Sequence, residues 1–187
     1  MASGKPDASW PTLFRRHVGR WAGTATHLSP TGGVLDTHAT ELRQGIRGLA
    51  FAQRNTYQWA AGDGGEAARE EVHDFPGQWD ATTGTLHIES ARLKGFARVV
   101  DDDCLVFYAT YKSGLSLPLA PGGDGDGEGG GGAPGAAGPD VDVYDLIRLV
   151  GDDRRYRTWQ VRRGGDIVKL VHVVNRRVTA DDPFIEM

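Results

Sequence analysis

Cysteine is almost absent from this chain of 187 residues, which contains only Cys104. A single cysteine cannot form an internal disulfide, whereas small secreted proteins usually depend on several. The first residues, MASGKPDASW, contain no apolar signal segment, and no run approaches the ~18 apolar residues of a membrane span. We therefore expect an intracellular protein, in the cytoplasm or an organelle stroma, without a membrane span.

An excess of basic charge is also lacking, because 21 Lys and Arg residues stand against 25 Asp and Glu residues, giving a formal net charge of -4. One basic cluster does interleave with aromatic residues, the segment RRYRTWQVRR at 154–163. Such a pattern suits single-stranded nucleic acid, but the acidic total opposes it, since nucleic-acid-binding domains are usually basic. We expect no nucleic-acid partner.

Motifs for metal binding and catalysis are scarce. No two histidines are closely spaced in the sequence; the six are His17, His27, His38, His73, His87 and His172. With one cysteine, a structural zinc site is not expected, and we predict neither a metal nor a cofactor. His172 is the candidate for haem ligation, because nitrobindin-like barrels use a histidine near the C-terminus, although a lone histidine more often faces solvent or bonds within the core. No serine lies in a G-x-S-x-G motif.

Strand signals, in contrast, are abundant. About ten short segments rich in strand-forming residues are separated by Gly, Asp and Pro, and no segment after the N-terminus keeps a helical period. Short antiparallel strands at this spacing favour a closed sheet, because closure removes exposed edges. The predicted fold is all-β, a single antiparallel up-and-down barrel of about ten strands, with a short helix from about Pro11 to His17.

The segment 121–140, PGGDGDGEGGGGAPGAAGPD, interrupts this pattern and contains ten of the 27 glycines. Such a composition cannot offset the entropy of ordering. Both flanking segments keep the same strand-like pattern, so we interpret 121–140 as a flexible loop inside one domain spanning residues 1–187.

Candidate binding residues come from the alternating segment LAFAQRNTYQW. Leu49 and Phe51 share a face with the polar residues that follow, and their apolarity favours an inward orientation. Arg157 shares a face with Trp159, and a buried arginine requires either a carboxylate of the protein or an anionic ligand; we favour internal pairing. The predicted ligand-binding residues are Gln53, Asn55, Tyr57, Trp59, Tyr108, Arg157 and Trp159.

A family resemblance adds to these patterns. The segments FRRHVGRWAGTATHLSPTGGVLD, NTYQW and RTWQVRRGGDIVKLVHV resemble the calycin superfamily, whose lipocalins have a G-x-W on the first strand. They are most similar to the lipocalin-like domains of unknown function in the DUF3598 family, which includes a chloroplast ATP-synthase biogenesis factor. The resemblance implies that Trp21 plugs one barrel end between Gly19 and Gly23. It also implies that a late arginine, at 176 or 177, packs over the tryptophan, and that any function lies at the other end.

Three functions remain open. The first is a barrel that binds an apolar or amphipathic small molecule, including an anionic one. The second is a cofactor-independent isomerase, cyclase or dehydratase using the same cavity, with His87, Glu89, Tyr57 and Arg157 as candidate groups. The third, suggested by the resemblance, is an assembly factor with a protein partner.

Overall fold

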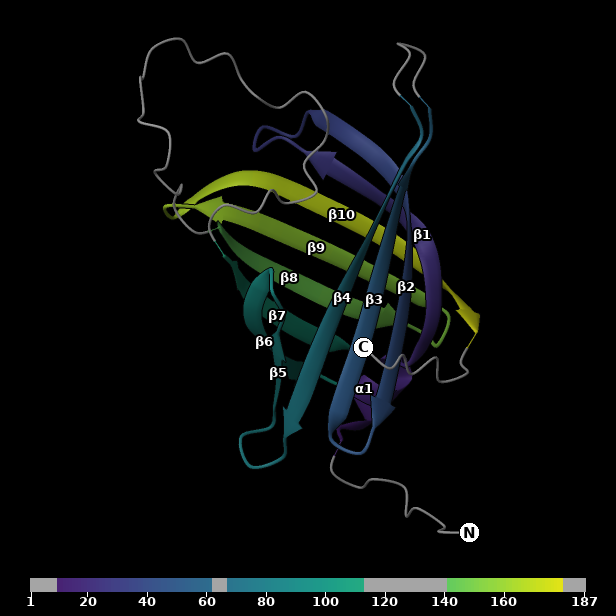
Figure 1. Cartoon of the computed structure of the whole chain (residues 1–187), viewed down its shortest axis with the longest axis vertical. Coiled ribbons are helices and arrows are strands. Elements are labelled where there is room, and N and C mark those ends of the chain that lie inside the picture. The colour runs from purple at the N-terminus through teal and green to yellow at the C-terminus, as the bar shows by residue number, and fades with distance from the viewer. Residues whose placement is uncertain (1–9, 62–66, 113–140, 180–187) are drawn as a thin grey trace.

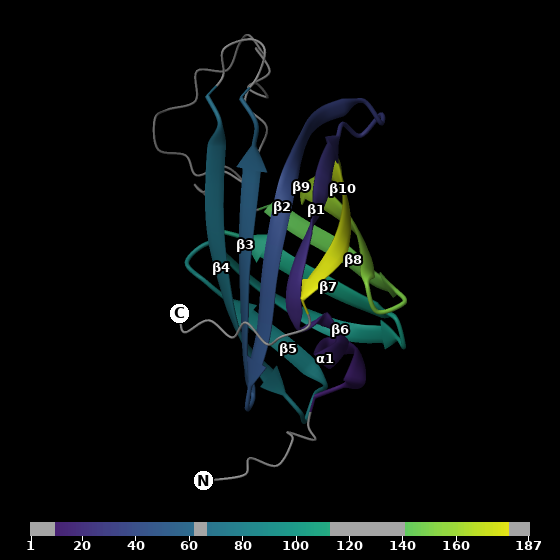
Figure 2. The same cartoon turned by 90° about the vertical axis from the view of Figure 1, so that its right-hand side faces the viewer.

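A computed structural model describes residues 10–61, 67–112 and 141–179, which form one short helix and a closed barrel of ten antiparallel strands (Figures 1 and 2). Each strand pairs with its neighbours in the sequence, and the last strand pairs with the first. This confirms the predicted all-β class. The elements are α1 (Thr12–His17), β1 (Gly19–Leu28), β2 (Val34–Arg47), β3 (Ala50–Trp59), β4 (Arg69–Asp80), β5 (Thr85–Glu89), β6 (Leu93–Asp101), β7 (Cys104–Tyr111), β8 (Val141–Val150), β9 (Arg154–Arg163) and β10 (Asp166–Thr179). The glycine-rich segment 121–140 lies outside the described residues.

Helix α1 lies across one end of the barrel (Figure 2). Its apolar side buries Leu13 and Phe14, and the helix ends at His17. Two residues later, Gly19 adopts a φ of 122°, a conformation that favours glycine. This glycine lets the chain turn from the helix directly into β1. In the part of the chain that the structure describes, no helix has the length and apolarity needed to cross a membrane.

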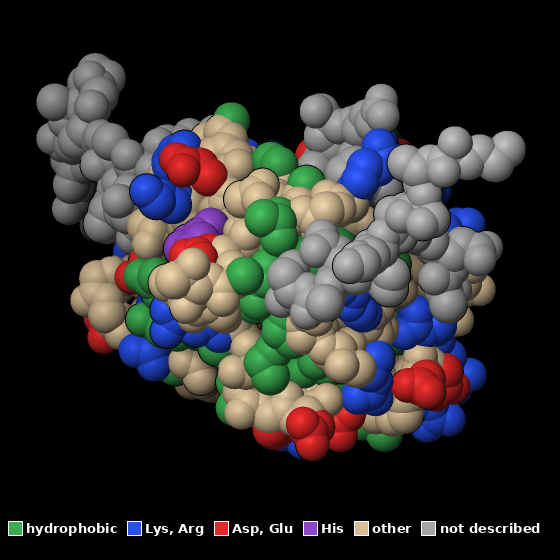
Figure 3. All heavy atoms as spheres, turned by 90° about the horizontal axis from the view of Figure 1, so that it is seen from below, with side chains coloured by type: hydrophobic (Ala, Val, Ile, Leu, Met, Phe, Trp, Pro, Cys, Tyr) green, Lys and Arg blue, Asp and Glu red, His purple; other side chains and the backbone are tan. Residues whose placement is uncertain are grey.

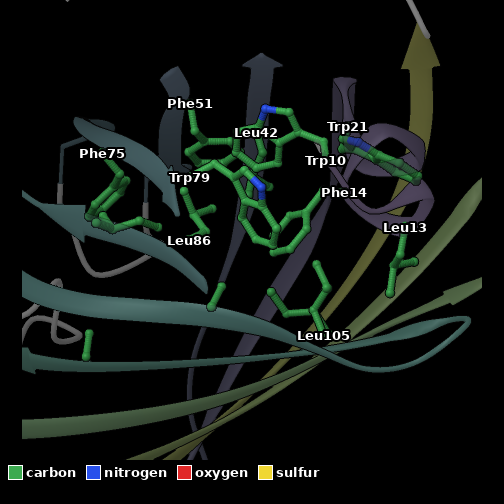
Figure 4. Packing of buried hydrophobic residues seen from close by; sticks show 14 of the residues in the cluster. Trp10, Leu13, Phe14, Trp21, Leu42, Phe51, Phe75, Trp79, Leu86 and Leu105 are labelled. Atoms are coloured by element: carbon green, nitrogen blue, oxygen red, sulfur yellow. The ribbon is translucent and has the colours of Figure 1, made fainter. Parts of the chain in front are cut away.

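Aromatic residues fill the barrel end that α1 covers (Figure 4). The Trp10 ring stacks on Trp79 at 4.9 Å, and Phe14 meets Trp79 edge-on at 5.4 Å. The Trp10 indole N–H donates to the carbonyl oxygen of Gly48 at 2.8 Å, so its polar edge is satisfied. Seen from this end, basic and acidic side chains surround a central band of hydrophobic atoms (Figure 3). This end of the barrel is therefore closed by packing.

Trp21 is completely buried at the same end. Its indole N–H donates to the carbonyl oxygen of His17 at 2.9 Å, which ties β1 to the end of the helix. The guanidinium carbon of Arg177 lies 4.2 Å from the centre of the Trp21 ring, and that of Arg155 lies 4.7 Å away. The structure thus has the buried tryptophan and the late arginine that the calycin resemblance implies.

Barrel closure depends on a close approach of β1 and β10 at Gly23. A Cβ atom at Gly23 would overlap the carbonyl oxygen of Val174 and would lie 2.8 Å from the Cα atom of Asn175. A side chain at this position would therefore force the two strands apart. The lack of a side chain at Gly23 therefore permits the close approach of the two strands.

The inward face of β3 agrees with the predicted alternation, with one exception. Phe51, Asn55, Tyr57 and Trp59 are buried. Leu49, which we expected on the same face, is 42% exposed because it lies in the turn between β2 and β3. Alternation applies only within the strand, so it gives no orientation for a residue in a turn.

Strand β4 contains a proline in its interior. The strand continues through the segment PGQWD to Asp80. Pro76 pairs with Ala52 of β3, whereas pairing with β5 starts only at Gly77. At Pro76 the strand therefore has a partner on one side only, a position where proline is tolerated.

Candidate functional site

A cavity lies inside the barrel above the floor formed by α1. The cavity has a volume of about 60 Å³ and opens to solvent. One wall is apolar and comes mainly from β4 to β7, with Phe75, Leu86, Ile88, Leu93, Ala97, Leu105 and Phe107. The opposite wall is polar and comes from β2, β3, β8 and β9, with Gln44, Gln53, Asn55, Tyr57, Asp145, Arg157 and Trp159.

A directional chain of hydrogen bonds runs along the polar wall. Arg155 donates to the amide oxygen of Gln44, whose amide nitrogen donates to Gln53 at 2.7 Å. The Gln53 amide nitrogen donates to the amide oxygen of Asn55 at 2.8 Å. The Asn55 amide nitrogen then donates to the hydroxyl oxygen of Tyr57 at 2.9 Å. Every step points the same way, because the chain starts at a guanidinium, which can only donate.

The Tyr57 hydroxyl is the end of this chain. Its oxygen accepts from Asn55, and among the described residues its own O–H has no hydrogen-bond acceptor. Burial raises the pKa of Tyr57 above its ordinary value, so the phenol keeps its proton at neutral pH. The hydroxyl can therefore donate to an acceptor group in the cavity.

A buried ion pair stands across the cavity on β8 and β9. The Arg157 Nε atom donates to Oδ2 of Asp145 at 3.0 Å, and Nη2 contacts the same oxygen. Burial raises the pKa of the Asp145 carboxyl, and the Arg157 guanidinium opposes that rise. Trp159 pairs with Asp145 across the strands, and its indole N–H interacts with that carboxylate and lowers its pKa. Neither Oδ1 of Asp145 nor the indole nitrogen completes a well-aligned hydrogen bond among the described residues, so both keep bonding capacity for a ligand.

Positive charge exceeds negative charge among the buried residues that the structure describes. Arg155, Arg157 and Lys169 are buried, against one buried carboxylate, that of Asp145. His17 adds no charge, because burial and the neighbouring arginines hold its pKa well below the ordinary value. Arg157 pairs with Asp145, and Lys169 interacts with the partly exposed Asp36, so in the described part of the chain the uncompensated buried cation is Arg155, although the whole chain has a net charge of -4.

Five of the seven predicted binding residues line the cavity: Gln53, Asn55, Tyr57, Arg157 and Trp159. Trp59 points inward but does not line it; its indole N–H donates to Asp36 at 2.8 Å, nearer the open end. Tyr108 is a wrong prediction, because it lies on the outer face of β7 and bonds to Asp142 at 3.0 Å. The inward residues of β7 are the odd-numbered ones.

Three further residues for which we expected a function lie on the outer face of the barrel. His172 is exposed on β10, so it cannot hold haem iron inside the barrel. His87 and Glu89, the acid–base candidates of the enzyme hypothesis, are exposed on β5. They are separated by the barrel wall from Tyr57 and Arg157.

Several cavity residues were missed by sequence reasoning. Asp145 follows the inward alternation of VDVYDLIRLV, so its position could have been found, but its role needed the β8–β9 register that places it beside Arg157. Gln44 lies on β2, where polar and apolar residues are mixed and no alternation is clear. Its position depends on the pairing with Gln53.

Comparison with family models and with curated protein sequences gives no match. Among solved structures, the chain is similar to a protein of unknown function from the DUF3598 family of Nostoc punctiforme, with a TM-score of 0.59, 14% identity, and coverage of 94% of this chain and 53% of that one. The chain thus spans about half the length of the Nostoc protein. It is also similar to Rv2717c from M. tuberculosis, with a TM-score of 0.52, 17% identity, and coverage of 88% and 94%.

A weaker likeness is to the S-type phycobiliprotein lyase CPES from Guillardia theta, with a TM-score of 0.44, 9% identity, and coverage of 91% and 93%. At these identities a likeness concerns the fold and does not extend to function. The sequence motifs imply a calycin-like barrel similar to the DUF3598 proteins, and this similarity is confirmed for the fold.

Proposed function

We propose that the barrel binds a small amphipathic molecule with an anionic or strongly accepting head group. The observation that carries this proposal is the buried Arg155, which donates to the lining residue Gln44 and has no carboxylate partner among the described residues, together with the apolar wall. Burying an unbalanced cation is costly, and a bound anion offsets that cost. An apolar tail would lie along the wall of β4 to β7.

Two groups would recognise the head. Tyr57 has a hydroxyl proton without an acceptor among the described residues, which favours a carbonyl or carboxylate oxygen. The indole N–H of Trp159 makes no well-aligned hydrogen bond in the same part of the chain, and it would turn from the Asp145 carboxylate to the ligand as a second donor. Because Asp145 already pairs with Arg157, the head group would receive hydrogen bonds from Tyr57 and Trp159 within the positive field of the buried arginines.

The size of the cavity limits the ligand. A space of about 60 Å³ is narrow, whereas pockets for drug-sized ligands typically hold roughly 300–1,000 Å³. A slender chain with a small head fits this space better than a flat polycycle. A short straight-chain carboxylic acid is the simplest molecule that meets all three conditions.

The experiment is isothermal titration calorimetry of the full chain with straight-chain acids from hexanoate to dodecanoate. Tyr57→Phe removes only the hydroxyl and should weaken binding about tenfold, the equivalent of one buried hydrogen bond. Tyr108→Phe is the matched control on the outer face and should bind like the wild type. Equal losses in both variants, or none in Tyr57→Phe, would remove Tyr57 from the site. If the wild type bound none of the acids, the proposed function would be wrong.

A further inference from the structure

A second group of polar side chains lies near the end of the barrel opposite α1. The turn between β1 and β2 lies at that end (Figure 1). The β1–β2 pairing brings His27 into register with Asp36, and His38 follows two residues later on the same face of the strand. His27 and His38 are buried, and Asp36 is partly exposed. The three belong to the interior of the barrel but not to the cavity lining described above.

Their potential ligand atoms lie close together. One such atom from each residue lies within 4.8 Å of the other two, and the two imidazole rings are 4.9 Å apart and nearly perpendicular. Oδ2 of Asp36 bonds to Nδ1 of His38 at 2.9 Å. Nδ1 of His27 lies 3.3 Å from Nζ of Lys169. Each histidine therefore has its Nδ1 engaged by a neighbour and its Nε2 left to bind something else.

Nε2 of His38 is independent evidence that this cluster binds a ligand. It is buried and has no hydrogen-bond partner among the described residues. A buried nitrogen without a partner is uncommon and is explained by an unseen water or ion. A carboxylate on Nδ1 that leaves Nε2 free is the arrangement found where histidine binds a metal, because the carboxylate orients the ring.

We propose that His27, Asp36 and His38 form a binding site for a divalent transition-metal ion of the zinc type. The two imidazole Nε2 atoms suit Zn²⁺, Co²⁺ and their neighbours as ligands, and the set leaves further positions for water. Asp36 holds Nδ1 of His38 and orients that ring toward the ion. Ligand atoms around a tetrahedral ion are about 3.4 Å apart, as ligand distances near 2.0–2.1 Å require, so binding brings the two Nε2 atoms to that spacing.

The protonation of the histidines suits metal binding. Burial and the nearby Lys169 lower the pKa of His27 to about 3, and burial lowers that of His38. Both imidazoles are neutral at pH 7, so no proton has to leave an imidazolium before the metal binds.

Lys169 also opposes the ion, because its ammonium places a positive charge beside His27. Lys169→Met removes that charge while keeping most of the apolar stem. The proposal therefore predicts tighter metal binding in Lys169→Met than in the wild type. A site made only of adventitious surface histidines would not respond to this buried lysine.

The test is titration of the chelator-treated full chain with Zn²⁺ by calorimetry and with Co²⁺ by visible absorption. The wild type should bind one equivalent of each ion, and bound Co²⁺ should show the absorption of a low-coordinate site. His27→Ala and His38→Ala should each weaken binding at least tenfold. His172→Ala, which removes an exposed histidine from the outer face of β10, should bind like the wild type.

Circular dichroism of each metal-free variant establishes whether it is folded. If either alanine variant is unfolded, Asp36→Asn replaces it, and about tenfold weaker binding is expected. The absence of stoichiometric Zn²⁺ binding by the folded wild type would overturn the proposal. Unchanged affinity in folded His27→Ala or His38→Ala would do the same, and so would loss of binding in His172→Ala alone.

Discussion

Replacing Trp21 with alanine should destabilise the barrel by about 4–6 kcal/mol. Emptying a buried aromatic site costs about 3–5 kcal/mol. The carbonyl of His17 would lose its hydrogen bond, about 1 kcal/mol, and Arg155 and Arg177 would lose their contacts with the ring, about 0.5–1 kcal/mol each. These contributions overlap, so the total lies below their sum.

A loss of this size is comparable with the whole stability of a typical domain, about 5–15 kcal/mol. Urea denaturation followed by circular dichroism would measure it. Trp21→Phe keeps an aromatic ring but removes the indole N–H, so it should cost about 1–3 kcal/mol. Tyr144→Ala, at a position 43% exposed on the outer face, is the control and should change stability by less than about 1 kcal/mol.

The order of the three variants is the decisive result. Trp21→Ala should be the least stable, Trp21→Phe intermediate, and Tyr144→Ala close to the wild type. A loss below about 1 kcal/mol for Trp21→Ala would mean that the tryptophan does not close the barrel.

Three other predictions concern stability, all measured by urea unfolding. Arg157→Met should lower the free energy of unfolding by about 3–5 kcal/mol because it leaves the buried Asp145 carboxylate without its partner. Adding Asp145→Leu to this variant should restore most of the lost stability. Equal losses in the single and double variants would contradict a buried ion pair. Because the pKa of His17 is lowered in the folded protein, the unfolded chain binds more protons below about pH 6.5, so the free energy of unfolding is retained above that pH and falls as the pH drops through it. His17→Gln should reduce the slope of the free energy of unfolding against pH in this acidic range by about 1.4 kcal/mol per pH unit. An unchanged slope would refute the assignment of the pH dependence to His17. Gly23→Ala should cost about 1–3 kcal/mol or more because its Cβ would overlap the β10 backbone, whereas Gly33→Ala, in the turn after β1, should cost less; similar losses would show that β1 and β10 do not require the close approach.

The sequence predicts which face of a strand points into the barrel where large apolar residues lie on one face only. On β3 it correctly placed Phe51, Asn55, Tyr57 and Trp59 inside, because polar residues separate them. The helix at Pro11–His17 was also readable, since a glycine ends it and the apolar residues share one side. These features are local, so a short segment contains all the information they need.

Orientation could not be read where both faces are apolar. On β7 the run CLVFYATY is apolar at odd and even positions, and Cys104 and Leu105 are both buried. No pattern therefore distinguished Tyr108, which faces outward, from Phe107, which faces the cavity. The run around His172 on β10 is ambiguous for the same reason.

Contacts between strands were the second feature that could not be predicted from the sequence. His27 lies on β1, whereas Asp36 and His38 lie on β2, and the β1–β2 register brings the three together. The expectation of no metal site rested on spacing along the chain. Spacing reveals ligands on one segment but misses those that face each other across a hairpin.

The central claim is that the cavity prefers an anionic amphipathic molecule, and comparing octanoate with octanol tests it most directly. The two share an apolar tail and differ in the charge of the head group. Calorimetric titration of the wild type should give a dissociation constant at least about tenfold lower for octanoate, because the cationic excess around Arg155 and Arg157 favours the carboxylate. Equal affinities, or tighter binding of octanol, would contradict the claim.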